Sequence, residues 1–206
     1  MSDKVKYPVI TISREFAAGG RTIARMLSEQ LGIPWYDNDF VKKAAEESGI
    51  SEDEILKTGE EISRGSVFLN SFLNNLSSTP CAYDALYEVQ KSIILKLALK
   101  EPCILVGRCA NYILQEANIQ ALHVYLYAQM KDRLKRAVTL SENADVDIVH
   151  YVEARDTLRN NYYRHYTGKN LGSAEDFNLS LDTGFLGYDG CVTIIKQVVE
   201  MINNRQ

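Results

Sequence analysis

A short stretch near the start of the chain has the composition expected of a loop that binds phosphate. Residues 13–22 read Ser-Arg-Glu-Phe-Ala-Ala-Gly-Gly-Arg-Thr. Such a loop needs small residues that let backbone N–H groups approach the anion, and glycine adopts the unusual dihedral angles that this requires. Arg21 and Thr22 then open a predicted helix whose N-terminus favours negative charge. They would bring a cation to the phosphate and a hydroxyl to Mg²⁺. The small residues are Ala17, Ala18, Gly19 and Gly20.

The loop differs from the common phosphate-binding pattern G-x-x-x-x-G-K-[ST] in two places. The first glycine is missing, and no lysine is present. Arg21 or Arg14 would have to supply the charge, although a guanidinium is planar and larger than an ammonium. Glu15 lies inside the loop, where it could serve as a base or Mg²⁺ ligand, or pair with either arginine. The alternative is an ordinary strand–turn–helix with two turn glycines.

The loop follows the first of five predicted strands, at 9–12, 33–36, 102–106, 121–127 and 178–182. Predicted helices alternate with them, at 23–31, 38–100, 129–140, 145–166 and 192–202, including one long helix from about 82 to 100. This alternation predicts a three-layer α/β fold with a doubly wound, five-stranded parallel sheet. We expect one domain over residues 1–206, with a helical insertion at about 38–100.

Polar residues follow nearly every predicted strand, where ligands of α/β sheets bind. Arg108 comes directly after a buried strand and a glycine. Asp37 ends the second strand and could accept a hydrogen bond from a substrate hydroxyl, hold a metal-bound water, or cap the next helix. Asp182 could bind a ligand or cap the turn after it. These positions predict one site built from several strand ends.

The bulk composition excludes some classes of function. The net charge is −4 over 206 residues, so nothing indicates a nucleic-acid or membrane partner. No apolar run of 18 residues and no secretory leader is present, which predicts a cytoplasmic protein. The cysteines form no C-x-x-C pair, and with three scattered histidines they predict reduced thiols and no zinc site.

Several motifs resemble those of a known family. Residues 10–37 align without a gap to the opening of the bacterial cytidylate kinases. The sequence Ile-Ser-Arg-Glu-Phe-x-x-Gly-Gly-Arg is closer still to the cytidylate kinase-like family, which opens with I-S-R-E-[FY]-x-x-G-G-R. Further matches lie at 33–37, 106–114, the tyrosine-rich 161–169 and 178–183. The resemblance covers nearly the whole chain and implies a P-loop kinase fold.

The resemblance also implies roles for the candidate residues. Ala17 to Thr22 would hold the donor phosphates of ATP, with Mg²⁺ at Thr22. Asp37 and Arg108 would hold the acceptor. A lid over about 129–170 would close on the phosphates through four arginines, which are Arg133, Arg136, Arg155 and Arg159. Their spacing places each pair on one helix face, which would neutralise phosphoryl charge or form a solvated basic surface paired with acids.

The chain departs from the cytidylate kinases on both sides of the site. In the gapless alignment Gly20 falls on the lysine position, and a shift of one residue puts Arg21 there. The R-D-x-x-D-x-x-R pattern that reads cytosine has Arg159 for its second aspartate and Tyr162 for its last arginine. Specificity for cytidine is therefore not implied. The tyrosines Tyr162, Tyr163 and Tyr166 could stack on a base or pack their helix.

Three functions are compatible with these observations. The first is an ATP-dependent phosphotransferase that acts on a nucleoside monophosphate or another small acceptor. The second is a nucleotide- or phosphate-binding regulatory protein without transfer activity, which the missing lysine favours. The third is an interaction protein that keeps only the fold. The sequence is compatible with a homo-oligomer and does not identify the acceptor.

Overall fold

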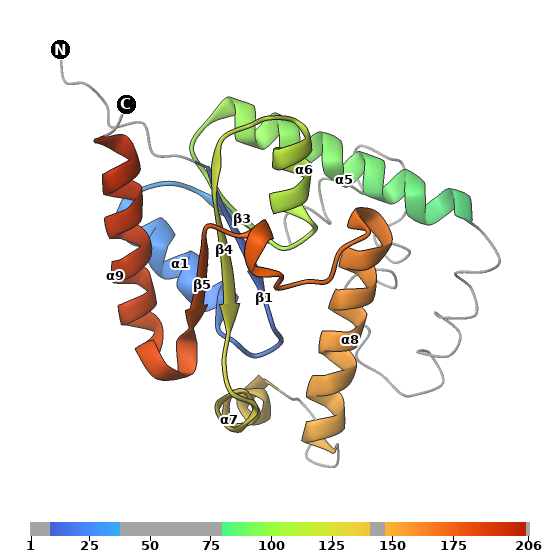
Figure 1. The fold of residues 1–206 in the computed structure, drawn as a ribbon, viewed down its shortest axis with the longest axis vertical. Coiled ribbons are helices and arrows are strands. Elements are labelled where there is room, and N and C mark those ends of the chain that lie inside the picture. Colours follow the sequence, from blue (N-terminus) through green and yellow to red (C-terminus); the bar gives the residue numbers. More distant parts are fainter. Residues whose placement is uncertain (1–8, 38–79, 141–146, 205–206) are drawn as a thin grey trace.

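The structure is a computed structural model that describes residues 9–37, 80–140 and 147–204 (Figure 1). Predicted helices within 38–79 lie outside the described residues. The strands are β1 (Val9–Arg14), β2 (Trp35–Tyr36), β3 (Ile104–Val106), β4 (Ala121–Tyr127) and β5 (Leu179–Asp182). The helices are α1 (Gly20–Leu31), α5 (Pro80–Lys100), α6 (Ala110–Glu116), α7 (Met130–Leu140), α8 (Ile148–Thr167) and α9 (Thr183–Asn203), with a 3₁₀ turn at Ala174–Asp176.

The strands form one five-stranded parallel sheet in the order β2-β3-β1-β4-β5, which confirms the predicted fold. β1 lies at the centre, with Ile10 opposite Ile104 in β3 and Leu122 in β4. A central parallel strand is covered on both faces, so it consists mainly of apolar and β-branched residues. All six residues of β1 are buried.

Alternate residues of the strands belong to two separate cores, which makes the fold three-layered. Ile10 and Ile12 pack with α1 and α9 on one face of the sheet. Val9 and Leu105 pack with α5, α6 and Tyr163 of α8 on the other. Figure 1 shows α1 and α9 together on one side, and α5 and α6 on the opposite side. Because all five strands are parallel, their carboxyl ends lie at one edge of the sheet.

The bounds of several strands differ from the prediction. β1 continues through Arg14, two residues beyond the expected end, so the Arg14 backbone is fixed by pairing with Leu126. β2 and β3 begin later than expected, after Pro34 and Pro102. Proline has no N–H to donate to a ladder, which accounts for the shorter strands. The Pro34 carbonyl still accepts a hydrogen bond from the Ile104 N–H at 2.9 Å.

Two aspartates fix the starts of the helices that follow the sheet edge. Asp182 ends β5 and accepts hydrogen bonds from the N–H groups of Gly184 and Phe185, so it caps α9. Asp147 caps α8 in the same way. α7 lies beyond the carboxyl end of β4 (Figure 1). Among the described helices, none is long and apolar enough to cross a membrane.

Candidate functional site

The loop between β1 and α1 has the backbone geometry of an anion-binding turn. Ala17 has a φ of 60° and Gly19 a φ of 84°, both in the left-handed region. Gly19 is the N-cap of α1, and no side chain caps that end of the helix. The first turn of α1 contains no acidic residue. The helix N-terminus therefore keeps its partial positive charge directed to the loop, as phosphate binding requires.

Arg14 crosses the floor of this loop. Its side chain is buried and passes so close to Gly20 that a methyl group there would lie 2.9 Å from Arg14 Cγ. Its guanidinium continues to Gly107, which follows β3 and has a φ of 79°. The two glycines thus leave the space that the arginine occupies. The predicted strand-end residues Arg14 and Gly107 are in contact.

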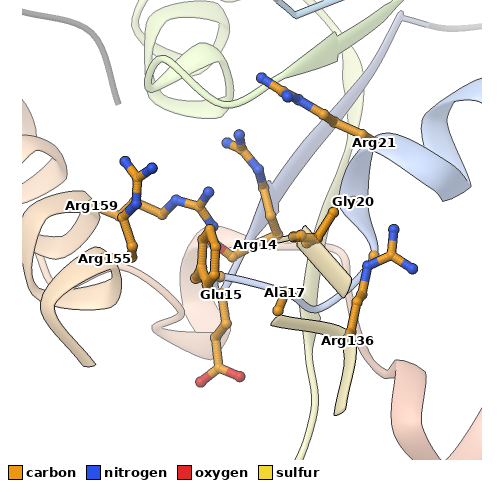
Figure 2. A pocket seen from close by; sticks show the side chains of 11 residues that line it. Arg14, Glu15, Ala17, Gly20, Arg21, Arg136, Arg155 and Arg159 are labelled. Carbon is orange, nitrogen blue, oxygen red and sulfur yellow. The ribbon is translucent and has the colours of Figure 1, made fainter. Parts of the chain in front are cut away.

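An open pocket of about 140 Å³ lies over the loop (Figure 2). Ala17, Gly19 and Gly20 line it, whereas Ala18 is buried beneath. Five arginines from β1, α1, α7 and α8 also line it, namely Arg14, Arg21, Arg136, Arg155 and Arg159. All five were predicted as site residues. Arg14 and Arg21 came from the loop and the start of the helix after it, and the other three came from the two predicted lid helices. The pocket brings together charges that lie up to 145 residues apart.

Asp37 is held between two of these arginines. Its carboxylate pairs with Arg21 Nε, and its Oδ1 lies 3.9 Å from Arg14 Nη2. The side chain of Asp37 is only 11% exposed, whereas that of Arg21 is 49% exposed. The structure thus places Asp37 beside the loop, where its charge is already balanced by guanidinium groups. It does not line the pocket over the loop.

Arg136 reaches the start of α1 from α7. Its Nη2 donates to Thr22 Oγ1 at 2.7 Å, and its Nη1 donates to the Tyr188 hydroxyl at 2.8 Å. The guanidinium also lies over the Tyr188 ring, 5.0 Å from its centre. The same ring packs on Gly19, where it leaves no room for a side chain. Tyr188 therefore positions both the arginine and the loop.

Arg133 has a different environment, although it lies one turn before Arg136. It is buried, and its guanidinium pairs with Asp156 of α8 and lies 3.3 Å from Glu15 Oε2. It also donates to the carbonyls of Ala128 and Phe16. Arg133 was predicted to close on phosphate, but it does not line the pocket. In the structure it joins α7, α8 and the loop.

Glu15 completes this internal cluster. Its carboxylate accepts a hydrogen bond from the Ala128 N–H at 3.1 Å, and in Figure 2 it points away from the labelled guanidinium groups. Burial raises the pKa of Glu15 above its ordinary value, and the Ala128 N–H and the Arg133 charge offset this only in part. Among the described residues, the arginine that pairs with Glu15 is Arg133, which lies far from the loop in the sequence.

α8 covers the loop with cations that rest on aromatic rings. Arg155 lies 5.6 Å and Arg159 5.3 Å from the centre of the Phe16 ring. Arg159 Nη1 also donates to the Arg14 carbonyl at 3.4 Å. The Phe16 N–H donates to Asp156 at 2.6 Å. Side chains of α8 thus contact both the backbone of the loop and the Phe16 ring. These contacts hold Arg155 and Arg159 at the pocket.

A second, smaller pocket adjoins the first. Arg14 and Arg159 line both pockets, and Ser13 and Arg108 line the second. Arg108 has a φ of 57°, in a turn where Gly107 and Cys109 also have positive φ values. The predicted acceptor residue Arg108 therefore lies here, apart from the loop. The turn is unusual because side chains other than glycine disfavour this region.

The tyrosines of α8 mainly pack the helix. Tyr163 is buried and accepts a hydrogen bond from Asn111 Nδ2 at 2.9 Å, and the Tyr162 hydroxyl donates to Gln90. Tyr166 stacks on Tyr87 with ring centres 3.8 Å apart. Tyr162 and Tyr163 also line the second pocket. Packing, rather than a free stacking platform, is thus the environment of Tyr163 and Tyr166.

Three residues that position the site were missed as site residues from the sequence. Asp156 is the first aspartate of the R-D-x-x-D-x-x-R pattern, from which this chain departs at other positions. Its place directly after Arg155 was a usable signal. Phe16 occupies the aromatic position of the I-S-R-E-[FY] motif, which was also a usable signal. Tyr188 had none, because its role depends on contacts with Arg136 of α7 and with the loop. Among the described residues, no group of three His, Cys, Asp or Glu side chains could hold a metal ion. Cys103, Cys109 and Cys191 are buried, free thiols.

Comparisons with known proteins agree with this architecture. An uncharacterized protein from Eubacterium ventriosum has 21% identity and a TM-score of 0.72, over 95% of this chain and 99% of that one. Shikimate kinase from Acinetobacter baumannii, in complex with shikimate, has 16% identity and a TM-score of 0.53, over 95% and 94%. The YorR protein from Bacillus subtilis, in complex with phosphorylated GDP, has 16% identity and a TM-score of 0.50, over 94% and 98%.

These structural likenesses show that the fold is that of P-loop kinases. A search of curated proteins gives no match. Residues 9–184 match the cytidylate kinase-like family, a range that includes the loop, both pockets and all the arginines described above. The chain therefore belongs to the cytidylate kinase-like family.

Proposed function

We propose that this protein is an ATP-dependent phosphotransferase that acts on a nucleoside monophosphate or another small acceptor. The observation that carries the proposal is the pocket over the loop, where five arginines surround the N-terminus of α1. Guanidinium groups gathered beside a helix N-terminus favour the binding of a polyanion such as a phosphate chain. Phosphoryl transfer needs mainly positioning and charge stabilisation, which guanidinium groups provide. The kinase-like family and fold support the same reading.

A nucleoside triphosphate bound at the loop would supply the phosphoryl group. The amides at the start of α1 would bind its phosphates, with Gly19 and Gly20 permitting their close approach. Arg155 and Arg159 would cover them from α8, where Phe16 already orients both side chains. The acceptor oxygen would bond to the terminal phosphorus as the bond to the bridging oxygen breaks. The arginines would stabilise the negative charge that develops on the bridging oxygen as it leaves with the nucleoside diphosphate.

The second pocket is the proposed acceptor site. Arg108 and the Ser13 hydroxyl line it and would bind an anionic or hydroxylated acceptor. Arg14 and Arg159 line both pockets, so they would lie where donor and acceptor meet. Among proteins of this fold, the shikimate kinase was solved with shikimate and the YorR protein with phosphorylated GDP. Both a small hydroxylated acid and a nucleotide are therefore reasonable classes of acceptor to test.

The predicted Mg²⁺ at Thr22 does not fit the described residues. The Thr22 hydroxyl accepts a hydrogen bond from Arg136, and Asp37 pairs with two arginines. The Glu15 carboxylate is engaged by Ala128 and Arg133. Mg²⁺ prefers carboxylate, hydroxyl and water oxygens in an octahedral arrangement. We therefore assign no step of the proposed transfer to a metal held by these residues.

A second candidate is a nucleotide-binding regulatory protein without transfer activity. The lysine-free loop favours it, because that lysine normally contacts the transferred phosphate. The Asp37 carboxylate, which could have accepted a proton from the acceptor, is instead balanced by Arg14 and Arg21. In this reading the pocket would bind the nucleotide and the second pocket would bind no acceptor productively.

Two measurements separate these functions. Calorimetric titration with ATP, with and without MgCl₂, tests the donor site, and no binding at millimolar ATP by the folded protein would overturn both candidates. Release of ADP is then measured with a panel of nucleoside monophosphates and small hydroxylated acids. Acceptor-dependent turnover supports the phosphotransferase. Binding of ATP without turnover for any acceptor supports the regulatory protein.

A further inference from the structure

The pocket over the loop has an unusual balance of charge. Among the described residues, its lining contains five arginines and one acidic residue, Glu15. The Glu15 carboxylate points away from the labelled guanidinium groups in Figure 2. Sites that hold a divalent cation together with phosphate normally offer carboxylate or hydroxyl oxygens to the metal. The described part of this lining instead offers guanidinium groups.

The Thr22 hydroxyl is the protein oxygen best placed to bind a metal at the start of α1. Arg136 Nη2 lies 2.7 Å from it. A Mg²⁺ ion on the same oxygen would lie within about 5 Å of that nitrogen, because Mg²⁺–oxygen bonds are about 2.1 Å long. Two cations at such a distance repel strongly in a partly buried site. Arg136 in this position therefore disfavours a metal on Thr22.

The position of Arg136 is fixed by contacts other than that with Thr22. Its other terminal nitrogen donates to the Tyr188 hydroxyl, and its guanidinium lies over the Tyr188 ring. Tyr188 itself packs against Gly19 of the loop. The guanidinium is thus held beside the first turn of α1, where the phosphates of a bound nucleotide would lie.

We propose that this pocket binds the phosphate chain of a nucleoside triphosphate without a protein-held divalent cation, because the Arg136 guanidinium takes the place of the metal at Thr22. The inference rests on the proposed function in that the ligand is a nucleoside triphosphate. Because the Thr22 oxygen accepts a hydrogen bond from Arg136, the hydroxyl keeps its own proton to donate to a phosphate oxygen. Guanidinium groups bind phosphate through paired N–H donors, which a metal ion does not provide.

The direct test compares ATP in EDTA with ATP in excess MgCl₂, by calorimetry on the full chain. Metal-free ATP carries more negative charge than its Mg²⁺ complex, so the arginines should bind it at least as tightly. A Kd for the Mg²⁺ complex more than about threefold lower than that for metal-free ATP would overturn the inference. That result would leave the proposed function intact, whereas no binding of ATP in either buffer would overturn both.

The Arg136→Ala variant tests the role of the guanidinium itself. We expect metal-free ATP to bind about tenfold more weakly, since a charged hydrogen-bonding partner of phosphate is lost. Binding of the Mg²⁺ complex should weaken by a smaller factor, because the metal can then reach Thr22. Equal weakening of the two ligands would show that Arg136 acts only as a general charge, and would overturn its metal-replacing role.

Lys131→Ala is the matched control, because it removes one positive charge from an exposed position on the same helix. We expect the Kd of both ligands to change by less than about threefold in this variant. The thermal midpoint of each variant is measured first, so that loss of binding is compared only between folded proteins. If Lys131→Ala also weakened ATP binding tenfold, the Arg136 effect would be one of long-range charge, which would overturn the inference.

Discussion

Arg133 and Arg136 lie one turn apart on α7 but belong to different regions of the molecule. Arg133 is buried under the loop and pairs with Asp156 and Glu15. Arg136 lines the pocket above the loop and bonds to two hydroxyl groups, those of Thr22 and Tyr188. In the lower region, formed by Arg133, Asp156 and Glu15, the cation is paired with carboxylates. In the upper region, the lining of the pocket over the loop, arginines outnumber carboxylates among the described residues. That difference separates an arginine that holds the site together from one that can bind a ligand.

The comparison also explains how the pocket keeps its cations close together. Guanidinium groups repel one another, so the helices that carry them need other attractive contacts. Arg133 and Asp156 supply such a contact between α7 and α8, and Asp156 also accepts a hydrogen bond from the Phe16 N–H. The ion pairs of the lower region therefore stabilise the arrangement that the upper region requires.

The largest expected effect is on stability, from Arg133→Ala. The substitution leaves Asp156 and Glu15 partly buried without their cation, so unfolding free energy should fall by about 3 kcal/mol. Arg136→Ala removes contacts to neutral hydroxyls and should cost about 1 kcal/mol or less. Urea unfolding followed by circular dichroism measures both. Similar losses for the two variants would contradict the distinction between the two regions.

The next effect concerns the turn after β3, which lies beside Arg14 in the upper region. Gly107→Ala places a side chain at a φ of 79° and in the space of the Arg14 guanidinium. We expect a loss of about 1–2 kcal/mol in unfolding free energy from the left-handed backbone alone. ATP binding should weaken as well, because Arg14 must move.

Gly32→Ala is the control for this substitution. Gly32 also has a positive φ, of 67°, but no atom lies near the added methyl group. It should lose a similar amount of stability and keep its ATP affinity in calorimetry. If Gly107→Ala bound ATP as well as Gly32→Ala, Arg14 would have no role in the pocket.

Much of the fold could be predicted from local patterns. The β-branched run at Val9–Ile12 and the alternation of strands with helices were sufficient for a parallel sheet. The helix predicted at 23–31 ends where expected, because Gly32 follows it and adopts a left-handed φ of 67°. The less accurate strand ends are at Pro34 and Pro102, where ladder pairing decides the boundary. The helices expected within 38–79 lie outside the described residues.

The candidate site could be predicted only to the level of strand ends and helix faces. The rule that ligands bind at the carboxyl ends of strands selected Asp37, Arg108 and Asp182. The rule that residues three apart share a helix face grouped Arg133 with Arg136 and could not separate them. Their separation depends on Asp156 and Tyr188, which lie 23 and 52 residues away in the chain. Packing between helices, which no local pattern encodes, decides which arginine is neutralised.

A smaller effect is expected from Arg21→Ala, which removes a cation at the first turn of α1. Arg21 lines the pocket, whereas Arg25, one turn further along, pairs with Glu29 on the exposed surface. We expect ATP to bind about tenfold more weakly to Arg21→Ala, and about equally to Arg25→Ala and the unaltered protein. Calorimetric Kd values decide this. Equal effects of the two substitutions would remove Arg21 from the proposed phosphate site.

The smallest expected effect is the contribution of Glu15, in the lower region, to the pH dependence of the unfolding free energy. Burial raises the pKa of Glu15 above its ordinary value of 4.5. In the folded protein Glu15 therefore holds its proton to a higher pH than in the unfolded chain. Its contribution to stability is greatest below pH 4.5 and is lost as the pH rises through the folded-state pKa.

Glu15→Gln removes this titrating group and keeps the shape of the side chain. Relative to that of the unaltered protein, its unfolding free energy should therefore be larger, meaning that the variant is more stable, at pH 7 than at pH 4. The difference between the two proteins is measured by urea unfolding at both values, which cancels the titration of every other carboxylate. The opposite sign would mean that the Arg133 charge outweighs burial at Glu15. The lower region would then draw its stability from the Glu15–Arg133 ion pair as well as from the pairing of Arg133 with Asp156.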